Sequence, residues 1–69
     1  MKEVRLTLNR YLDSHGITRY ALSQAAGIKY PIIDNYYKNK VIRYDRDTLS
    51  RILEALDCGL TDILEVIDT

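Results

Sequence analysis

The sequence predicts an all-α fold, a compact bundle of five helices in one domain that spans residues 1–69. Through most of the chain, apolar residues recur at the three- and four-residue spacing of helices. Thr or Asp stands at the start of three of these stretches and Gly stands at the end of three, as is typical of helix caps. No alternation of polar and apolar residues lasts long enough to predict a sheet. A chain of 69 residues supports a single core that only just suffices for independent stability.

The first helix is predicted over residues 3–15, ending at Gly16. Its apolar residues lie near helical spacing and would face the core: Val4, Leu8, Tyr11 and Leu12. Three cations, Lys2, Arg5 and Arg10, would lie on its outer side. His15 precedes the closing glycine and suits a charge partner for the helix C-terminus better than a metal ligand, because the chain has no second His.

The second and third helices are predicted between Thr18 and Lys38, joined at Gly27. Thr18 can cap the first of them, and Gly27 allows the left-handed backbone of a sharp turn. Pro31 suits the first turn of the next helix, residues 30–38. Its inner face would carry Ile33, Tyr36 and Tyr37. The opposite face would present Tyr30, Pro31, Asp34, Asn35 and Lys38 to the solvent.

The segment from Asn39 to Asp45 lacks a helical period and is predicted to be a loop. Its apolar residues have two interpretations: they cover the domain's own core, or they contact a second protomer. We favour the first for Ile42 and Tyr44, because so small a chain has little other core.

Two more helices are predicted after this loop. Asp45 or Asp47 would cap the fourth, which carries an apolar stripe and ends at Gly59. The stripe consists of Leu49, Ile52, Leu53 and Leu56. Thr61 would begin a fifth helix with more aliphatic residues than one face can hold. The surplus, together with Val41 of the preceding loop, predicts a dimer interface formed by Val41, Ile63, Val66 and Ile67.

The charge is balanced overall but unevenly distributed. The formal net charge is zero, which counts against nucleic acid as a partner. However, residues 1–46 hold nine basic and four acidic side chains, whereas residues 47–69 hold one basic and six acidic ones. A local positive face can attract a polyanion even when the total is neutral, and we expect an acidic C-terminal helix to point away from it.

Other functional classes lack their usual residues. The single His and the single Cys lie in different predicted helices, and no metal-binding, nucleotide-binding or protease motif occurs. Cys58 lies between Leu56 and Leu60 and is expected to be a small buried apolar residue. We therefore expect no catalysis, no metal and no cofactor. No signal peptide or membrane-spanning pattern is found, so a soluble cytoplasmic protein is expected.

The stretch from Thr18 to Ile33 resembles the helix-turn-helix of the lambda repressor and Cro type, also called the XRE family. The matching residues, in order and spacing, are Thr18, Leu22, Ser23, Gly27, Ile28 and Ile33. The likeness continues from Asp47 to Leu64, which is similar to the fourth helix, turn and fifth helix of that family. Four positions depart from the common pattern, which often has Gln at Arg19, Ala at Ser23, Ser at Lys29 and Gly at Asn39.

The resemblance implies a DNA interface on the second and third helices. Phosphate contacts map to Thr18, Arg19, Lys38, Asn39, Lys40 and Arg43. The base-reading residues would be Lys29, Tyr30, Pro31, Ile32, Asp34 and Asn35. Asn35 can pair with adenine, Lys29 with guanine, and Pro31 or Ile32 with a thymine methyl group. Asp34 has three interpretations: it accepts from cytosine, it repels wrong sequences, or it bonds to a neighbouring cation.

These features lead to two functional hypotheses. The first is a small sequence-specific regulator of the repressor or Cro type, which binds a palindromic operator as a homodimer and needs no small-molecule ligand. The second is a protein-binding module on the same scaffold, similar to an antitoxin or an anti-repressor, because the fold alone does not fix the function.

Overall fold

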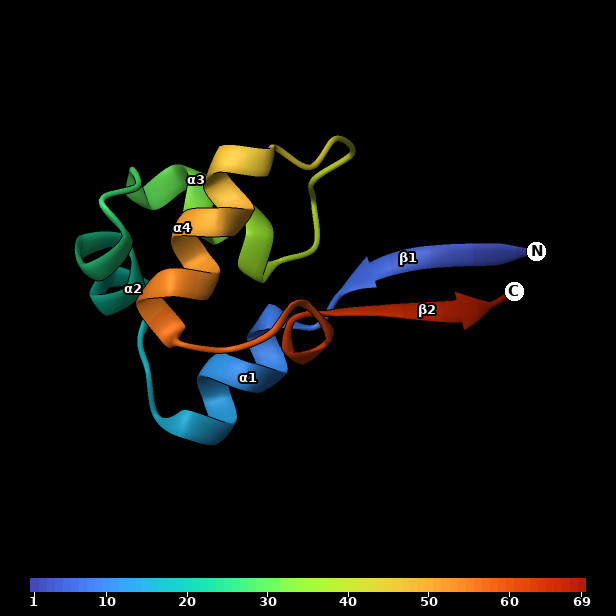
Figure 1. The fold of residues 1–69 in the computed structure, drawn as a ribbon, viewed down its shortest axis with the longest axis horizontal. Coiled ribbons are helices and arrows are strands. Elements are labelled where there is room, and N and C mark those ends of the chain that lie inside the picture. The colour runs from blue at the N-terminus through green and yellow to red at the C-terminus, as the bar shows by residue number, and fades with distance from the viewer.

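The computed structural model describes all residues from Met1 to Thr69 and contains four α-helices and two strands (Figure 1). The helices are α1 (Leu8–His15), α2 (Arg19–Ala26), α3 (Tyr30–Tyr37) and α4 (Arg46–Leu56). The strands are β1 (Lys2–Leu6) and β2 (Leu64–Asp68), and a 3₁₀ turn, Leu60–Asp62, precedes β2. The fold is therefore mostly helical, and the prediction of an all-α bundle with five helices is wrong.

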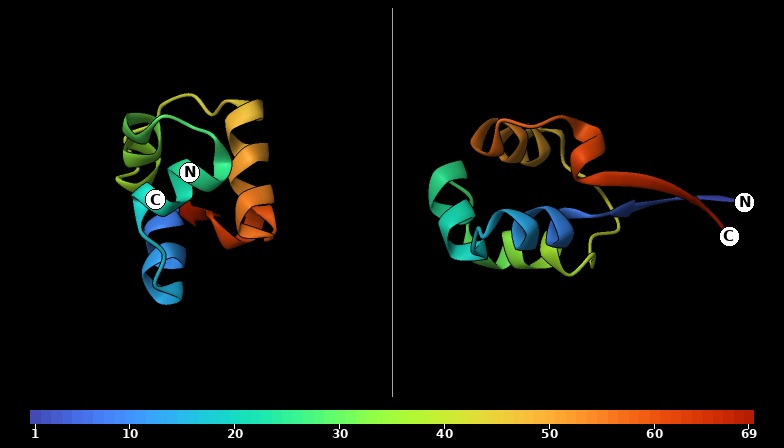
Figure 2. Two further views of the ribbon diagram at one scale, coloured as in Figure 1. Left: turned by 90° about the vertical axis from the view of Figure 1, so that its left-hand side faces the viewer. Right: turned by 90° about the horizontal axis from the view of Figure 1, so that it is seen from below.

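The strands β1 and β2 form an antiparallel ribbon that joins the two ends of the chain. In its register Val4 pairs with Val66 and Arg5 with Glu65. Figures 1 and 2 show the ribbon extending away from the helices, with both termini at its tip. The molecule thus has two parts, a helical body and a projecting ribbon.

The predicted first helix begins five residues too early. Residues 2–6 are a strand, and α1 starts at Leu8. Val4, Leu6 and Leu8 alternate with the polar Arg5 and Thr7, which is the two-residue period of a strand. Val4 and Leu8 are also four residues apart, which matches a helix in part. Pairing with β2 satisfies the backbone groups on one edge of this segment and decides in favour of the strand.

The predicted fifth helix does not exist. Asp57, with φ 51°, ends α4 two residues before the expected Gly59. The Gly59 N–H then donates to the Asp62 carboxylate at 2.9 Å, which closes the 3₁₀ turn. Beyond it the chain pairs with β1, and the β-branched Val66 and Ile67 suit a strand.

The core lies where the four helices meet the start of the ribbon. Its fully buried side chains are Leu8, Leu12, Leu22, Ile33, Ile52 and Ile63. Helix α2 packs against both α3 and α4. The Tyr36 hydroxyl accepts a bond from the Asp45 N–H at 3.2 Å, which ties α3 to the start of α4. This packing fixes the position of α3 relative to α2.

Three further expectations are tested by burial. Ile42 is 95% exposed, so the prediction that it covers the core is wrong, whereas Tyr44 lies against Tyr36 with ring centroids 6.4 Å apart. Ile63 belongs to the core of its own chain and cannot serve the predicted dimer interface. Cys58 is partly buried and free.

No helix combines the length and the apolar character needed to cross a bilayer.

Candidate nucleic-acid interface

The corner between α2 and α3 has the caps that the sequence predicts. The Thr18 hydroxyl accepts from the Ala21 N–H at 3.0 Å at the start of α2. Gly27 ends this helix with φ 65°, and the Ile28 N–H donates back to the Ser23 carbonyl at 3.1 Å. An added Cβ at Gly27 would meet only Arg51, at 3.6 Å, so the left-handed backbone and not crowding requires glycine here.

Helix α3 has one buried and one exposed face. Ile33 and Tyr36 are buried and hold the helix against the body. Lys29 precedes the helix as an extended N-cap residue, and Pro31 occupies its first turn. The exposed residues of this segment are Lys29, Tyr30, Pro31, Ile32, Asn35 and Lys38. Five of the six predicted base-reading residues are therefore accessible together.

Asp34 differs from the other predicted readers because it lies between two cations. Its carboxylate contacts the Arg19 guanidinium at 2.6 Å and the Lys38 ammonium at 3.0 Å. Hydrogen bonds from Lys38 and from Arg19 hold the pKa of Asp34 below its usual value, although reduced hydration acts in the opposite direction. Of the three interpretations of Asp34, the bond to a neighbouring cation is the one observed.

Arg19, at the start of α2, is held from two sides. Besides its bond to Asp34, its guanidinium lies 4.6 Å from the centre of the Tyr37 ring. The Tyr37 hydroxyl in turn donates to the Asp13 carboxylate at 2.9 Å, which also raises the pKa of Tyr37. One N–H of Arg19 faces Asp34, so the remaining donors of this five-donor group stay free for a phosphate.

The other predicted phosphate contacts lie at the C-terminal end of α3. Asn39 follows α3 with φ 56°, a conformation that suits Asn and Gly, and its side-chain oxygen accepts from the Leu6 N–H at 3.1 Å. Lys40 and Arg43 are exposed and form no ion pair. With Ile32 and Asn35 they line a hollow of about 410 Å³ between α3 and the following loop.

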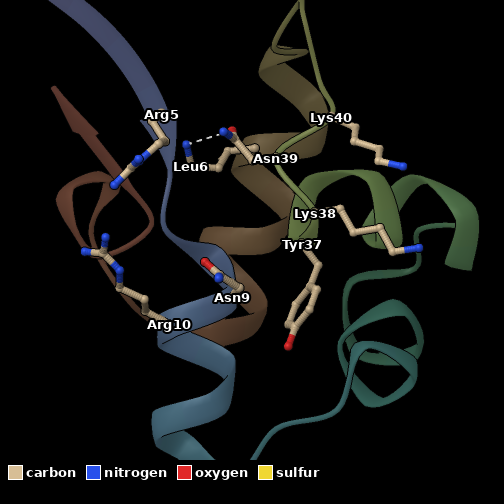
Figure 3. Close-up of a pocket in the computed structure, with 8 residues that line it drawn as sticks. All are labelled: Arg5, Leu6, Asn9, Arg10, Tyr37, Lys38, Asn39 and Lys40. Carbon is tan, nitrogen blue, oxygen red and sulfur yellow. Dashed lines mark hydrogen bonds between the residues drawn. The ribbon is translucent and has the colours of Figure 1, made fainter. Parts of the chain in front are cut away.

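A second hollow, of about 610 Å³, lies on the other side of Lys40 (Figure 3). Its lining residues are Arg5, Leu6, Asn9, Arg10, Tyr37, Lys38, Asn39 and Lys40. The arginines extend toward β2 and the lysines toward the opposite side, with Asn9 between them. Sequence reasoning assigned no role to Arg5, Asn9 or Arg10, because it placed them on a longer helix. The alternation of polar and apolar residues around Arg5 was the signal that could have indicated a strand there.

The acidic C-terminal segment does not form a separate helix that points away from the cations. Glu65 on β2 contacts Arg5 at 3.0 Å and Arg10 at 3.5 Å. The pairing of Lys2 with Asp68 brings two further opposite charges together. The ribbon thus neutralises part of the positive charge of the N-terminal half, whereas near α3 the ion pairs are those of Asp34 with Arg19 and Lys38.

The structure groups no set of three or more His, Cys, Asp or Glu side chains that could hold a metal ion. His15 bonds to the Tyr11 carbonyl at 2.8 Å, at the C-terminal end of α1. Cys58 lies near Tyr11 in a partly buried position where lost hydration raises the pKa of its thiol. His15 is exposed and contacts its own helix, whereas Cys58 and Tyr11 pack against the core.

Comparison with known proteins agrees with this geometry. The family model that describes the Cro/C1-type HTH DNA-binding domain matches residues 7–69, which include α1 to α4 and β2. The curated proteins and the solved structures gave no match. The match spans nearly the whole chain and includes the corner from Thr18 to Ile33. The chain belongs to the Cro/C1-type helix-turn-helix DNA-binding domains.

Proposed function

We propose that this protein is a small sequence-specific regulator, of the repressor or Cro-like type, that places α3 in the major groove of double-stranded DNA. Two copies bind a palindromic operator, with half-sites about 34 Å apart or a multiple of that distance. The protein acts in the cytoplasm, and it needs neither a cofactor nor a small-molecule inducer.

The observation that carries this proposal is the outward face of α3 with cations at both ends. Tyr30, Ile32 and Asn35 are exposed on a helix whose other face is fixed in the core. Lys29 precedes them, and Lys38, Lys40 and Arg43 follow. A rigid helix with polar and apolar side chains reads base edges, whereas flanking cations fix its register on the phosphates.

Each exposed side chain has a chemical role in the proposed complex. Asn35 pairs with adenine, Lys29 donates to guanine, and Ile32 or Pro31 contacts a thymine methyl group. The Tyr30 hydroxyl bonds to a base or a phosphate. Thr18 directs the free N–H groups at the start of α2 toward a phosphate, a common site for anions.

Asp34 has an indirect role in this complex. Its carboxylate holds Arg19 and Lys38 in place, at 2.6 and 3.0 Å, instead of reading a base. Arg19 and Lys38 come from different helices, so the carboxylate fixes the spacing of two phosphate contacts. The three groups together carry one net positive charge at neutral pH.

The test is a selection of bound sites from a random duplex pool, followed by binding measurements at several salt concentrations. We expect a palindromic consensus and an affinity that falls steeply with salt, by a slope of about 0.9 for each phosphate contact. Binding without sequence preference and without salt dependence would show that the proposal is wrong and would favour a protein partner.

Two variants separate base reading from phosphate binding. Asn35→Ala should lose about 1–3 kcal/mol on the selected site and relax the preference at one base pair. Lys40→Ala should weaken all sequences equally and reduce the salt slope by about 1. Gln24→Ala is the matched control, because Gln24 is exposed on α2 and lies outside the proposed contacts.

A further inference from the structure

The outer edge of β1 is open for another strand. The Thr7 N–H donates to the Ile63 carbonyl at 2.7 Å, and the Thr69 N–H donates to the Met1 carbonyl at 2.8 Å. Odd-numbered residues of β1 therefore direct their backbone groups toward β2, and even-numbered residues direct theirs away from it. Lys2 and Val4 form no backbone bond outside the ribbon. Their outward N–H and C=O groups can accept a further strand.

Asn39 marks one end of this open edge. The Leu6 N–H also points away from β2, and it donates to the Asn39 side-chain oxygen at 3.1 Å. This bond ties β1 to the end of α3 and occupies the edge nearest the helical body. The open outward groups are thus those of Lys2 and Val4, in the part of β1 nearer the N-terminus (Figure 1).

One face of the ribbon is apolar and uncovered. Val4 and Val66 are cross-strand partners on this face and are 50% and 62% exposed. They line an apolar hollow of about 370 Å³ together with Leu60 and Leu64. A two-stranded ribbon is only marginally stable by itself and gains stability from further strands that cover its apolar face.

We infer that β1 pairs antiparallel with β1 of a second copy of this chain to form a four-stranded sheet. The pairing is centred on Val4, which means that Val4 lies opposite Val4 of the partner subunit. The order of strands is β2, β1, the partner's β1 and the partner's β2. This surface supplies the contact between the two copies that the proposed function requires, and in that respect it rests on that function. It replaces the earlier set of interface residues, of which Ile63 is buried.

Charge selects this register over the alternatives. Centring on Val4 places Glu3 opposite Arg5 of the partner subunit, and the two-fold axis repeats the pair. Centring on Glu3 or on Arg5 would place like charges opposite each other, which is unfavourable. Pairing through β2, centred on Val66, would place Glu65 opposite an isoleucine and Leu64 opposite an aspartate, with no ion pair.

The same register extends both faces of the ribbon. On one face, the Val4–Val66 pairs of the two copies form a continuous row of four valines. On the other face, Glu65 contacts Arg5 at 3.0 Å within one chain, and Arg5 then meets Glu3 of the partner subunit. Alternating charges thus run across three of the four strands, because Glu3 pairs with the uncharged Ile67 in its own chain. The row of valines removes from water the surface that each ribbon exposes alone.

The interface is small, so dimers form weakly in solution and strongly on DNA. Leu6 keeps its bond to Asn39, so Val4 is the residue that exchanges backbone bonds with the partner subunit, and the contact covers residues 3–5 of each copy. So short a contact buries less than the roughly 1,000 Å² or more that a stable interface needs. Two adjacent half-sites raise the local concentration of the second copy and complete the sheet. We therefore expect cooperative binding to paired half-sites by a protein that is largely monomeric when free.

Cysteine cross-linking tests the contact directly. Val4→Cys, in a Cys58→Ser background, should form a disulfide-linked dimer upon mild oxidation, because opposed Cα atoms in a hydrogen-bonded pair lie about 5.5 Å apart. Val66→Cys in the same background is the control, as it is at least as exposed but lies on β2. We expect cross-linking through residue 4 to be at least tenfold faster. Equal or faster cross-linking through residue 66 would overturn the inference.

A charge substitution tests the register. Glu3→Lys, added to Val4→Cys, should slow the cross-linking at least tenfold, because it places a lysine opposite Arg5 of the partner subunit. Asp68→Lys makes the same change of charge on β2 and should leave the rate within a factor of two. A Glu3→Lys protein that cross-links as fast as its parent, with an unchanged circular dichroism spectrum, would overturn the inference.

Binding to a single half-site separates this inference from the proposed function. Glu3→Lys should bind one half-site as well as the unmodified chain does and should lose the cooperativity on two. Normal half-site binding together with failed cross-linking through residue 4 would overturn the interface and leave the function intact. Cross-linking without any DNA binding would refute the function and support the interface.

Discussion

The helical body and the ribbon differ in how their structures are specified. Helices α1, α2 and α4 begin or end at residues that act locally: Thr18 and Asp45 accept bonds from the next turn, and Gly16 and Gly27 adopt positive φ. The ribbon instead depends on contacts such as Arg5–Glu65, between residues 60 positions apart. Local signals can be read from a short window of sequence, whereas strand pairing requires knowledge of both partners.

The two parts also differ in burial, and hence in their contribution to stability. The fully buried side chains belong to the body or, for Ile63, to the point where the ribbon joins it. Val4 and Val66 on the ribbon are at least half exposed. The free energy of unfolding should therefore depend strongly on the body and weakly on the ribbon of a single chain.

The largest expected effect is from Ile33→Ala in α3. Ile33 is fully buried at the centre of the body, so truncation removes apolar contacts and leaves a cavity. We expect a loss of about 2–5 kcal/mol in the free energy of unfolding, measured by urea denaturation. A domain of 69 residues has roughly 3–10 kcal/mol in total, so the variant should be largely unfolded or close to it.

The neighbouring residue provides the matched control. Ile32 is 40% exposed on the outer face of the same helix. Ile32→Ala removes the same atoms and should change stability by no more than about 0.5 kcal/mol, while reducing affinity for the selected operator. Equal destabilisation by the two variants would show that α3 is not held as described.

An intermediate effect is expected from Val66→Ala on the ribbon. Val66 is the cross-strand partner of Val4, and such pairs contribute about 0.2–1 kcal/mol. Urea denaturation at low protein concentration should therefore show a small loss, with unchanged binding to a single half-site. A loss as large as that of Ile33→Ala would mean that the body depends on the ribbon, and the distinction between the two parts would fail.

Sequence reasoning located the helix-turn-helix and missed the ribbon for the same physical reason. Thr18, Gly27 and Pro31 act within a few residues of their own positions, and all three occupy the predicted places. Val4 fits a helix with Leu8 and a strand with Leu6, so only the presence of β2 decides between them. The apolar run after Thr61 had the same ambiguity, since a short run does not distinguish strand from helix.

Within the site, the sequence indicated which residues face outward but not which residues they contact. The exposed face of α3 follows from the helical period, and the positions of Tyr30 and Asn35 agree with it. The bond between Arg19 and Asp34 joins two helices across the corner, and the bond from Leu6 to Asn39 joins β1 to α3. Side-chain pairs of this kind depend on how the elements pack, so spacing along the chain could not reveal them.

The smallest expected effect concerns pH and the ion pairs of Asp34. Lys38 and Arg19 hold the pKa of Asp34 in the folded chain below its pKa in the unfolded chain. The two ion pairs therefore contribute fully to stability at a pH above the unfolded-state pKa. This contribution is lost as the pH falls through the folded-state pKa. Thermal melting of the unmodified chain and of Asp34→Asn should therefore differ slightly near pH 7 and converge in strong acid. Hydrogen bonds from Thr48 also lower the pKa of Asp45. Protonation of Asp45 in acid weakens the cap of α4 equally in both proteins, so it does not change the difference between their melting temperatures. A constant difference at all pH values would mean that Asp34 acts through packing and not through its charge.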